Sequence, residues 1–165
     1  MSNPFLDNAF HIRWSQLVPA AIEPDITTAL EQAQTAIDAL AAPPGEDEPL
    51  TAENTLLALE RATETLDTAW AQVSHLDAVR SNDAQRQAYN RMLPLVSEFY
   101  ARIPLNAGLW KRIEAYSRSA DAAQLTGARK RLLEETLADF RQNGADLPAD
   151  KKARFKAISQ ALSRL

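Results

Sequence analysis

Two histidines, His11 and His75, are the first candidates for metal chemistry, because imidazole is a common metal ligand in proteins. They stand 64 positions apart, and the chain contains no cysteine. A di-metal helical bundle uses Glu-x-x-His, but Gln72 stands three positions before His75 and Asn8 three before His11. Neither histidine has the His-Glu-x-x-His spacing that places two imidazoles and a glutamate base on one helix face. We therefore predict no metal-ligating residue, with His11 in a loop and His75 near a helix end.

Carboxylates crowd two predicted helices, with Glu134, Glu135 and Asp139 in one and Glu60 and Glu64 in the other. Acid–base catalysis needs two carboxylates in unlike environments across a cleft. Arg131 and Arg61 flank these groups, so we interpret them as solvated ion-pair faces. No Ser/His/Asp set and no glycine-rich phosphate loop occurs. The sequence predicts no catalytic and no cofactor-binding residue, although an enzyme using Glu134, Glu135 or His75 stays open if a pocket exists.

Basic residues gather toward the C-terminal half, in Lys111-Arg112, Arg129-Lys130-Arg131 and the group Lys151, Lys152, Arg154 and Lys156. Proteins that bind nucleic acid carry a basic footprint that displaces counterions. The net charge of −4 and the isoelectric point near 5.2 argue against nucleic acid as a partner. We interpret the clusters as solvated faces, with a contact surface for a second, acidic domain as the alternative.

The 165 residues suit one domain, which we expect to span residues 1–165. No apolar run approaches a membrane span, and the N-terminus lacks the basic and apolar regions of a signal peptide. We therefore expect no membrane partner and a cytoplasmic location.

Apolar residues spaced by three or four indicate helices throughout, and no segment alternates with period two. We predict an all-α bundle of about five to six helices, mostly antiparallel neighbours, over 23–41, 51–76, 84–103, 109–116, 122–142 and from Pro148 onward. Pro24 fits a first helical turn, Pro94 predicts a kink, and residues 42–49 form an exposed acidic, proline-rich loop. We assign Trp70, Phe99, Tyr100, Trp110 and Phe140 to the core, and Trp14 to a clamp on the N-terminal arm.

The last predicted helix has the apolar stripe Phe155, Ile158, Leu162 and Leu165 and stops without a cap. Two interpretations stay open: a docked C-terminal helix, or a piece of a longer chain.

Several strings, read in order, are similar to one family: Asn3-Pro4-Phe5, Trp14 to Pro19, Leu50-Thr51-Ala52-Glu53-Asn54-Thr55, Leu93 to Glu98, Arg131 to Glu135, and Leu137 to Ala145. Together they resemble the N-terminal helical region of the thimet oligopeptidase-like zinc metallopeptidases, with the bacterial oligopeptidase A-like branch the nearer match. The resemblance covers nearly the whole chain.

The resemblance implies a longer parent protein in which this region forms one wall of a deep channel that admits short unstructured peptides. It implies that the opposite, catalytic region supplies His-Glu-x-x-His, a further glutamate and zinc. None of these residues can be placed on this sequence. We therefore expect a catalytically silent piece whose partners are the parent's catalytic domain and, in the intact enzyme, short peptides. Without that domain we expect exposed apolar surface and self-association through the last helix. The alternative is a free-standing helical interaction or regulatory module.

Overall fold

A computed structural model describes residues 3–7, 9–45, 48–148, 151 and 154. Two short 3-10 helices precede six α-helices, and no strand occurs in these residues, which confirms the all-α prediction. The chain divides into two compact units: unit 1 comprises Met1–Ala39 and Ala58–Tyr100, and unit 2 comprises Leu40–Leu57 and Ala101–Leu165. In the part of the chain described, no helix has the length and apolarity that a membrane span requires.

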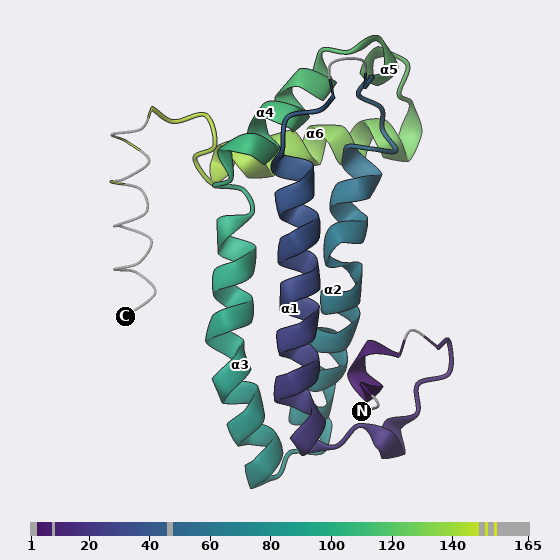
Figure 1. Cartoon of the computed structure of the whole chain (residues 1–165), viewed down its shortest axis with the longest axis vertical. Helices are drawn as coiled ribbons and strands as arrows, with labels where there is room; N and C mark the ends of the chain where they lie inside the picture. Colours follow the sequence, from purple (N-terminus) through teal and green to yellow (C-terminus); the bar gives the residue numbers. More distant parts are fainter. Residues whose placement is uncertain (1–2, 8, 46–47, 149–150, 152–153, 155–165) are drawn as a thin grey trace. The chain divides into compact units, whose positions relative to one another are not determined.

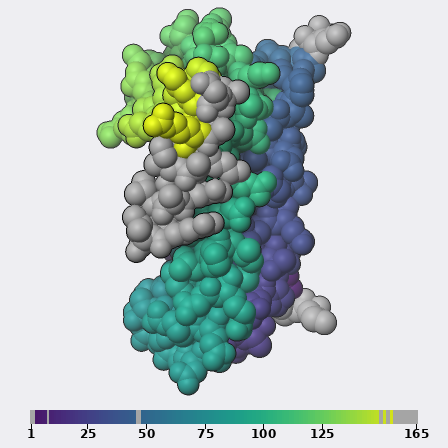
Figure 2. Space-filling view, turned by 90° about the vertical axis from the view of Figure 1, so that its left-hand side faces the viewer, coloured from purple at the N-terminus to yellow at the C-terminus, as the bar shows by residue number. Residues whose placement is uncertain are grey.

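Unit 1 is built from most of three long helices, α1 (Pro19–Ala41), α2 (Leu56–Val79) and α3 (Asp83–Arg102) (Figure 1). Each helix buries an apolar stripe with the predicted spacing: Ile22, Ile26, Ala29, Ala33 and Ile37 in α1, Leu66, Ala69 and Val73 in α2, and Ala88, Met92, Val96 and Phe99 in α3. Burying such side chains stabilises the unit by about 1.5–3 kcal/mol for each large one. Figure 2 shows α3 in teal lying directly against α1.

The α2–α3 pair is antiparallel, as the sequence predicts. Tyr100 near the end of α3 donates to Asp67, whereas Gln85 near its start donates to the Val73 carbonyl, further along α2. The predicted cap at Asn82 is confirmed, because its side-chain oxygen accepts from Gln85 N at 3.0 Å. The helix assignment of α3 continues through Pro94, and the kink there stays a prediction.

The start of α1 differs from the expectation. The helix begins at Pro19, not Glu23, so that Pro19 occupies the first-turn position expected of Pro24. Pro24 therefore lies inside the helix, where it cannot donate to the carbonyl of Ala20. Burial of Ile22 and Ile26 on either side keeps this turn helical despite the missing bond.

Unit 2 contains α4 (Ala107–Ser117), α5 (Ala120–Ala123) and α6 (Gly127–Gln142), together with residues 40–57. Its core cluster joins Ala52, Leu56, Tyr116 and Leu133. The predicted core residues Trp110 and Phe140 are buried here, with stacked rings 6.2 Å apart. Figure 1 shows α4, α5 and α6 in shades of green.

Two helix boundaries in or near unit 2 were predicted wrongly. Residues 52–55 form a turn in which Leu57 N donates to Ala52 O across five positions, and α2 begins only at Leu56. The helix expected over 122–142 is two helices, since Gly127 has φ +53°, a left-handed value that interrupts the ladder.

The end of α6 is confirmed. Gly144 adopts φ +86°, and Ala145 N donates to Phe140 O at 2.9 Å, which closes a Schellman motif. The loop predicted at 42–49 is confirmed where the structure describes it. Most of the helix predicted from Pro148, including its whole apolar stripe, lies outside the described residues.

Candidate functional site

The histidines are not brought together. His11 is exposed in the N-terminal segment beside Phe10, and His75 is exposed near the end of α2. The indole of Trp14 lies against His75, with ring centroids 5.3 Å apart. Trp14 therefore clamps the N-terminal segment onto α2, as the sequence predicts. Over the described residues, no group of three metal-binding side chains is assembled.

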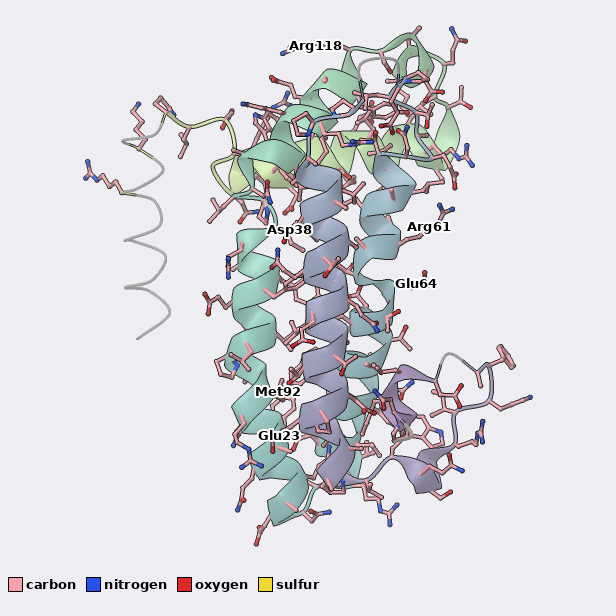
Figure 3. The ribbon with its side chains drawn as sticks, viewed as in Figure 1. Glu23, Asp38, Arg61, Glu64, Met92 and Arg118 are labelled. Atoms are coloured by element: carbon pink, nitrogen blue, oxygen red, sulfur yellow. The ribbon has the colours of Figure 1, made fainter. Side chains whose placement is uncertain are left out.

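The carboxylate groups also match the solvated interpretation. Glu134 and Glu135 are exposed on α6, and Glu135 pairs with Arg131, four positions earlier, at 3.2 Å. The side chains of Arg131 and Glu135 are 79% and 67% exposed, so the pair contributes little to stability. Figure 3 shows Arg61 and Glu64 projecting outward from α2.

One basic residue was placed wrongly by the sequence. Arg112 was assigned to a solvated face, but its side chain is 8% exposed in unit 2. Its terminal nitrogen donates to Asn54 O at 3.1 Å and pairs with Glu48 at 3.3 Å. Among the described residues its Nε has no hydrogen-bond partner. A buried guanidinium needs oxygen partners to offset its desolvation, and the segment before α2 supplies them.

Asn54 organises this segment. Its side-chain oxygen accepts from Thr51 N at 2.9 Å, while Thr51 Oγ1 accepts from Asn54 N at 3.2 Å, as in a capping box. Its side-chain nitrogen donates to Pro49 O and to Glu48. The Glu-Asn-Thr string that carries the family resemblance therefore has a structural role: it shapes the turn that covers Arg112.

Asp121 fixes the same segment from α5. One of its carboxylate oxygens accepts from Ala52 N at 3.0 Å and from the Tyr116 hydroxyl at 2.8 Å. Burial, and then the hydrogen bond to Asp121, raise the pKa of Tyr116 above its ordinary value, so the phenol stays a donor at neutral pH. Sequence reasoning missed the burial of Arg112 and the role of Asp121, although Thr51 and Asn54 stand three positions apart, as in a capping box.

The N-terminal arm is anchored by a buried carboxylate. Phe5 is fully buried, and its backbone N–H donates to Asp25 of α1 at 2.9 Å. Asp25 is only 2% exposed, and burial raises its pKa although the Phe5 bond opposes the rise. The Asn3-Pro4-Phe5 string thus tethers the arm.

These arrangements organise backbone and surface; none pairs an acid with a base over a reacting atom. What they do is hold backbone segments in place within each unit. An enzyme that used Glu134, Glu135 or His75 would need a pocket around that residue. All three side chains are exposed, and their positions do not support such a pocket.

Comparison with protein-family models and comparison with individual known proteins point to the same family. The N-terminal domain of neurolysin/thimet oligopeptidase, as a family model, matches residues 26–152. Oligopeptidase A of Haemophilus influenzae is 32% identical over all 165 residues, and oligopeptidase A of Escherichia coli is 30% identical over the same length. A probable cytosolic oligopeptidase A of Arabidopsis thaliana is 26% identical over 164 residues. The chain spans only 24% of the length of each bacterial relative.

Proposed function

Because the chain belongs to the neurolysin/thimet oligopeptidase N-terminal domain family, we propose that it forms one wall of the substrate channel in a zinc-dependent oligopeptidase. One observation carries this proposal: the whole chain aligns with oligopeptidase A but accounts for about a quarter of its length. The peptide-bond chemistry would then belong to the remaining polypeptide.

The residues described here do not fit a zinc site. Zinc in proteins takes three or four cysteine, histidine or carboxylate ligands, and no such group is assembled in the described part of the chain. The chain contains no cysteine, and its two histidines are exposed on separate segments. We therefore assign the zinc implied by the family to residues outside these 165, and we derive no step through it.

The wall acts through shape. Long helices that share one apolar core resist bending, because interiors packed to crystal-like density transmit strain instead of yielding. A stiff wall limits the width of a channel, so that short, unfolded peptides enter and folded proteins do not. The cytosolic description of the Arabidopsis relative supports a cytoplasmic location for this protein.

The test compares the 165-residue chain with the polypeptide encoded by its uninterrupted natural reading frame. We expect the longer polypeptide to hydrolyse a quenched fluorescent peptide of about ten residues, to lose this activity with a chelator, and to leave a folded protein uncut. We expect the 165-residue chain to hydrolyse neither and to hold far less than one zinc per chain by elemental analysis.

Two results would contradict the proposal. Chelator-sensitive hydrolysis by the 165-residue chain would place the chemistry within it. A reading frame that stops after Leu165 would favour the free-standing interaction module instead.

A further inference from the structure

The N-terminal arm exposes apolar side chains at an unusual density. Phe10 is 95% exposed, Val18 47%, Trp14 41% and Ile12 38%. We define these four residues as the arm face. More than half of the large hydrophobic residues that the described chain exposes belong to the arm face, and such a gathering of exposed apolar residues within one short segment favours an interaction surface.

The arm face is held in place at both ends. Phe5 is buried and its backbone N–H donates to Asp25 of α1, and the indole of Trp14 lies against the ring of His75 of α2. Figure 1 shows the purple N-terminal segment looping outward before it enters α1. A surface that is ordered before binding loses less conformational entropy when it binds.

The charge on the arm favours an apolar partner. Its two charged side chains, Asp7 and Arg13, pair at 3.0 Å, which leaves no net charge between them. Aromatic residues are enriched and unpaired charges are depleted at the centre of protein interfaces. The arm face has this composition.

The bacterial relatives contain much more polypeptide than this chain. The family model of the N-terminal domain begins at residue 26, after the arm, whereas the alignments with bacterial oligopeptidase A include the arm. The arm therefore belongs to the region aligned with oligopeptidase A but not to the residues that the family model matches. About three quarters of each bacterial relative lies outside the aligned region, because the chain covers only 24% of it.

We propose that the arm face docks onto an apolar surface of the polypeptide that follows this chain in the intact oligopeptidase, and so fastens the channel wall to the catalytic region. This inference rests on the proposed function, since it requires that polypeptide. The surface that covers the arm face then belongs to the same polypeptide. A second copy of the 165-residue chain covers the arm face only when the following polypeptide is absent.

The test uses hydrogen exchange followed by mass spectrometry on peptides that cover residues 9–18. In the intact protein we expect these amides to exchange at least about tenfold more slowly than in the 165-residue chain. Equal exchange in an intact protein that hydrolyses peptide would overturn the docking while leaving the proposed function standing. An intact protein without peptidase activity would instead defeat the proposed function.

A matched pair of variants separates docking from folding. Phe10→Ser with Ile12→Ser should leave the thermal midpoint of the 165-residue chain unchanged, because both side chains are exposed there. The same changes should lower the midpoint of the intact protein by several degrees. Val79→Ser, which alters a side chain that is 66% exposed on α2, should lower neither. Protection of residues 9–18 that appears in the 165-residue chain and rises with concentration would identify a second copy as the occupant and overturn the proposal.

Discussion

Units 1 and 2 hold comparable carboxylate–tyrosine pairs that have different roles. In unit 1, Asp67 accepts from Tyr100 and Thr63, both on helices that already pack through their apolar stripes. In unit 2, Asp121 accepts from Tyr116 and from the backbone of Ala52, 69 positions away in a segment without regular structure. The long helices of unit 1 already pack against each other, so Asp67 adds hydrogen bonds to helices that are in place without it. In unit 2, Asp121 holds a segment without regular structure in its path.

The same contrast applies to arginine. Arg91 of α3 pairs with Glu23 of α1 at 2.6 Å, with both side chains about half exposed (54% and 46%). Figure 3 labels Glu23 on α1 and, on α3, Met92, the residue after Arg91. Arg112 of unit 2 is buried and binds a backbone carbonyl as well as a carboxylate. The long helices of unit 1 therefore pack through periodic apolar stripes, whereas unit 2 combines an apolar cluster with buried polar contacts to an irregular segment.

The largest effect expected in unit 2 comes from Gly108→Ala. A Cβ at this position would overlap the carbonyl oxygen of Ala41, and a backbone atom cannot swing aside as a flexible side chain can. We expect a loss of about 3 kcal/mol in the free energy of unfolding, despite the better helix propensity of alanine. Urea unfolding followed by circular dichroism measures it.

Gly45→Ala is the matched control for this change. Its Cβ would meet only Glu48 Cβ at 3.8 Å, an ordinary contact, so we expect a change within about 0.5 kcal/mol. Equal losses in the two variants would show that the approach of α4 to Ala41 is not tight.

Asp121→Ala and Asp67→Ala compare the two units directly. Loss of Asp121 leaves the Ala52 N–H and the Tyr116 hydroxyl without their acceptor, and we expect a cost of about 2 kcal/mol. Loss of Asp67 removes bonds between more exposed groups, and we expect a cost below about 1 kcal/mol. Fluorescence of Trp110 follows unit 2, and fluorescence of Trp70 follows unit 1. A larger cost for Asp67→Ala would reverse the comparison.

The free energies of unfolding of Arg112→Met and Arg91→Met should differ by less than those of the two aspartate variants. Methionine keeps much of the volume of Arg112 and relieves the desolvation of its guanidinium, so we expect a cost of about 1 kcal/mol from the lost bonds to Asn54 and Glu48. Arg91→Met breaks an exposed pair and should cost less than about 0.5 kcal/mol. The same urea titrations test both. If Arg112→Met is more stable than the wild type, the desolvation free energy of the buried guanidinium exceeds the stabilisation from its bonds to Asn54 and Glu48.

The smallest effect is the pH dependence that Asp25 gives to unit 1. Burial raises the pKa of Asp25 above its ordinary value of 3.8, so the folded state holds this proton more tightly than the unfolded state. The contribution of Asp25 to stability is then greatest below pH 3.8 and falls as the pH rises through the folded-state pKa. The Asp25→Asn variant has no titrating group at this position, and its amide oxygen can still accept from Phe5 N.

Urea titrations of wild type and Asp25→Asn over a pH series isolate this contribution. The stability of the wild type minus that of the variant should decrease with rising pH above 3.8. A difference that increases with pH would show that the Phe5 bond outweighs burial.

The sequence predicts unit 1 better than unit 2 for a physical reason. The stripe through Ile22 and Ile26 and the cap at Asn82 depend on neighbours within four positions, so local spacing reveals them. The partners of Arg112 lie 58 and 64 positions away, and no local pattern shows that the chain will return to bury it. The break at residues 124–126, directly before Gly127, was missed because the apolar spacing of Leu125 and Leu132 continues across it.

Segments of the two units alternate along the sequence, so the ribosome releases part of unit 2 before unit 1 is complete. Residues Leu40–Leu57 of unit 2 leave the ribosome before unit 1 is complete, yet their core partners Tyr116 and Leu133 come much later. At about 5–20 residues per second, Leu56 waits roughly 4–15 s for Leu133. For those seconds the nascent chain carries Ala52 and Leu56 without the later residues that complete their core cluster.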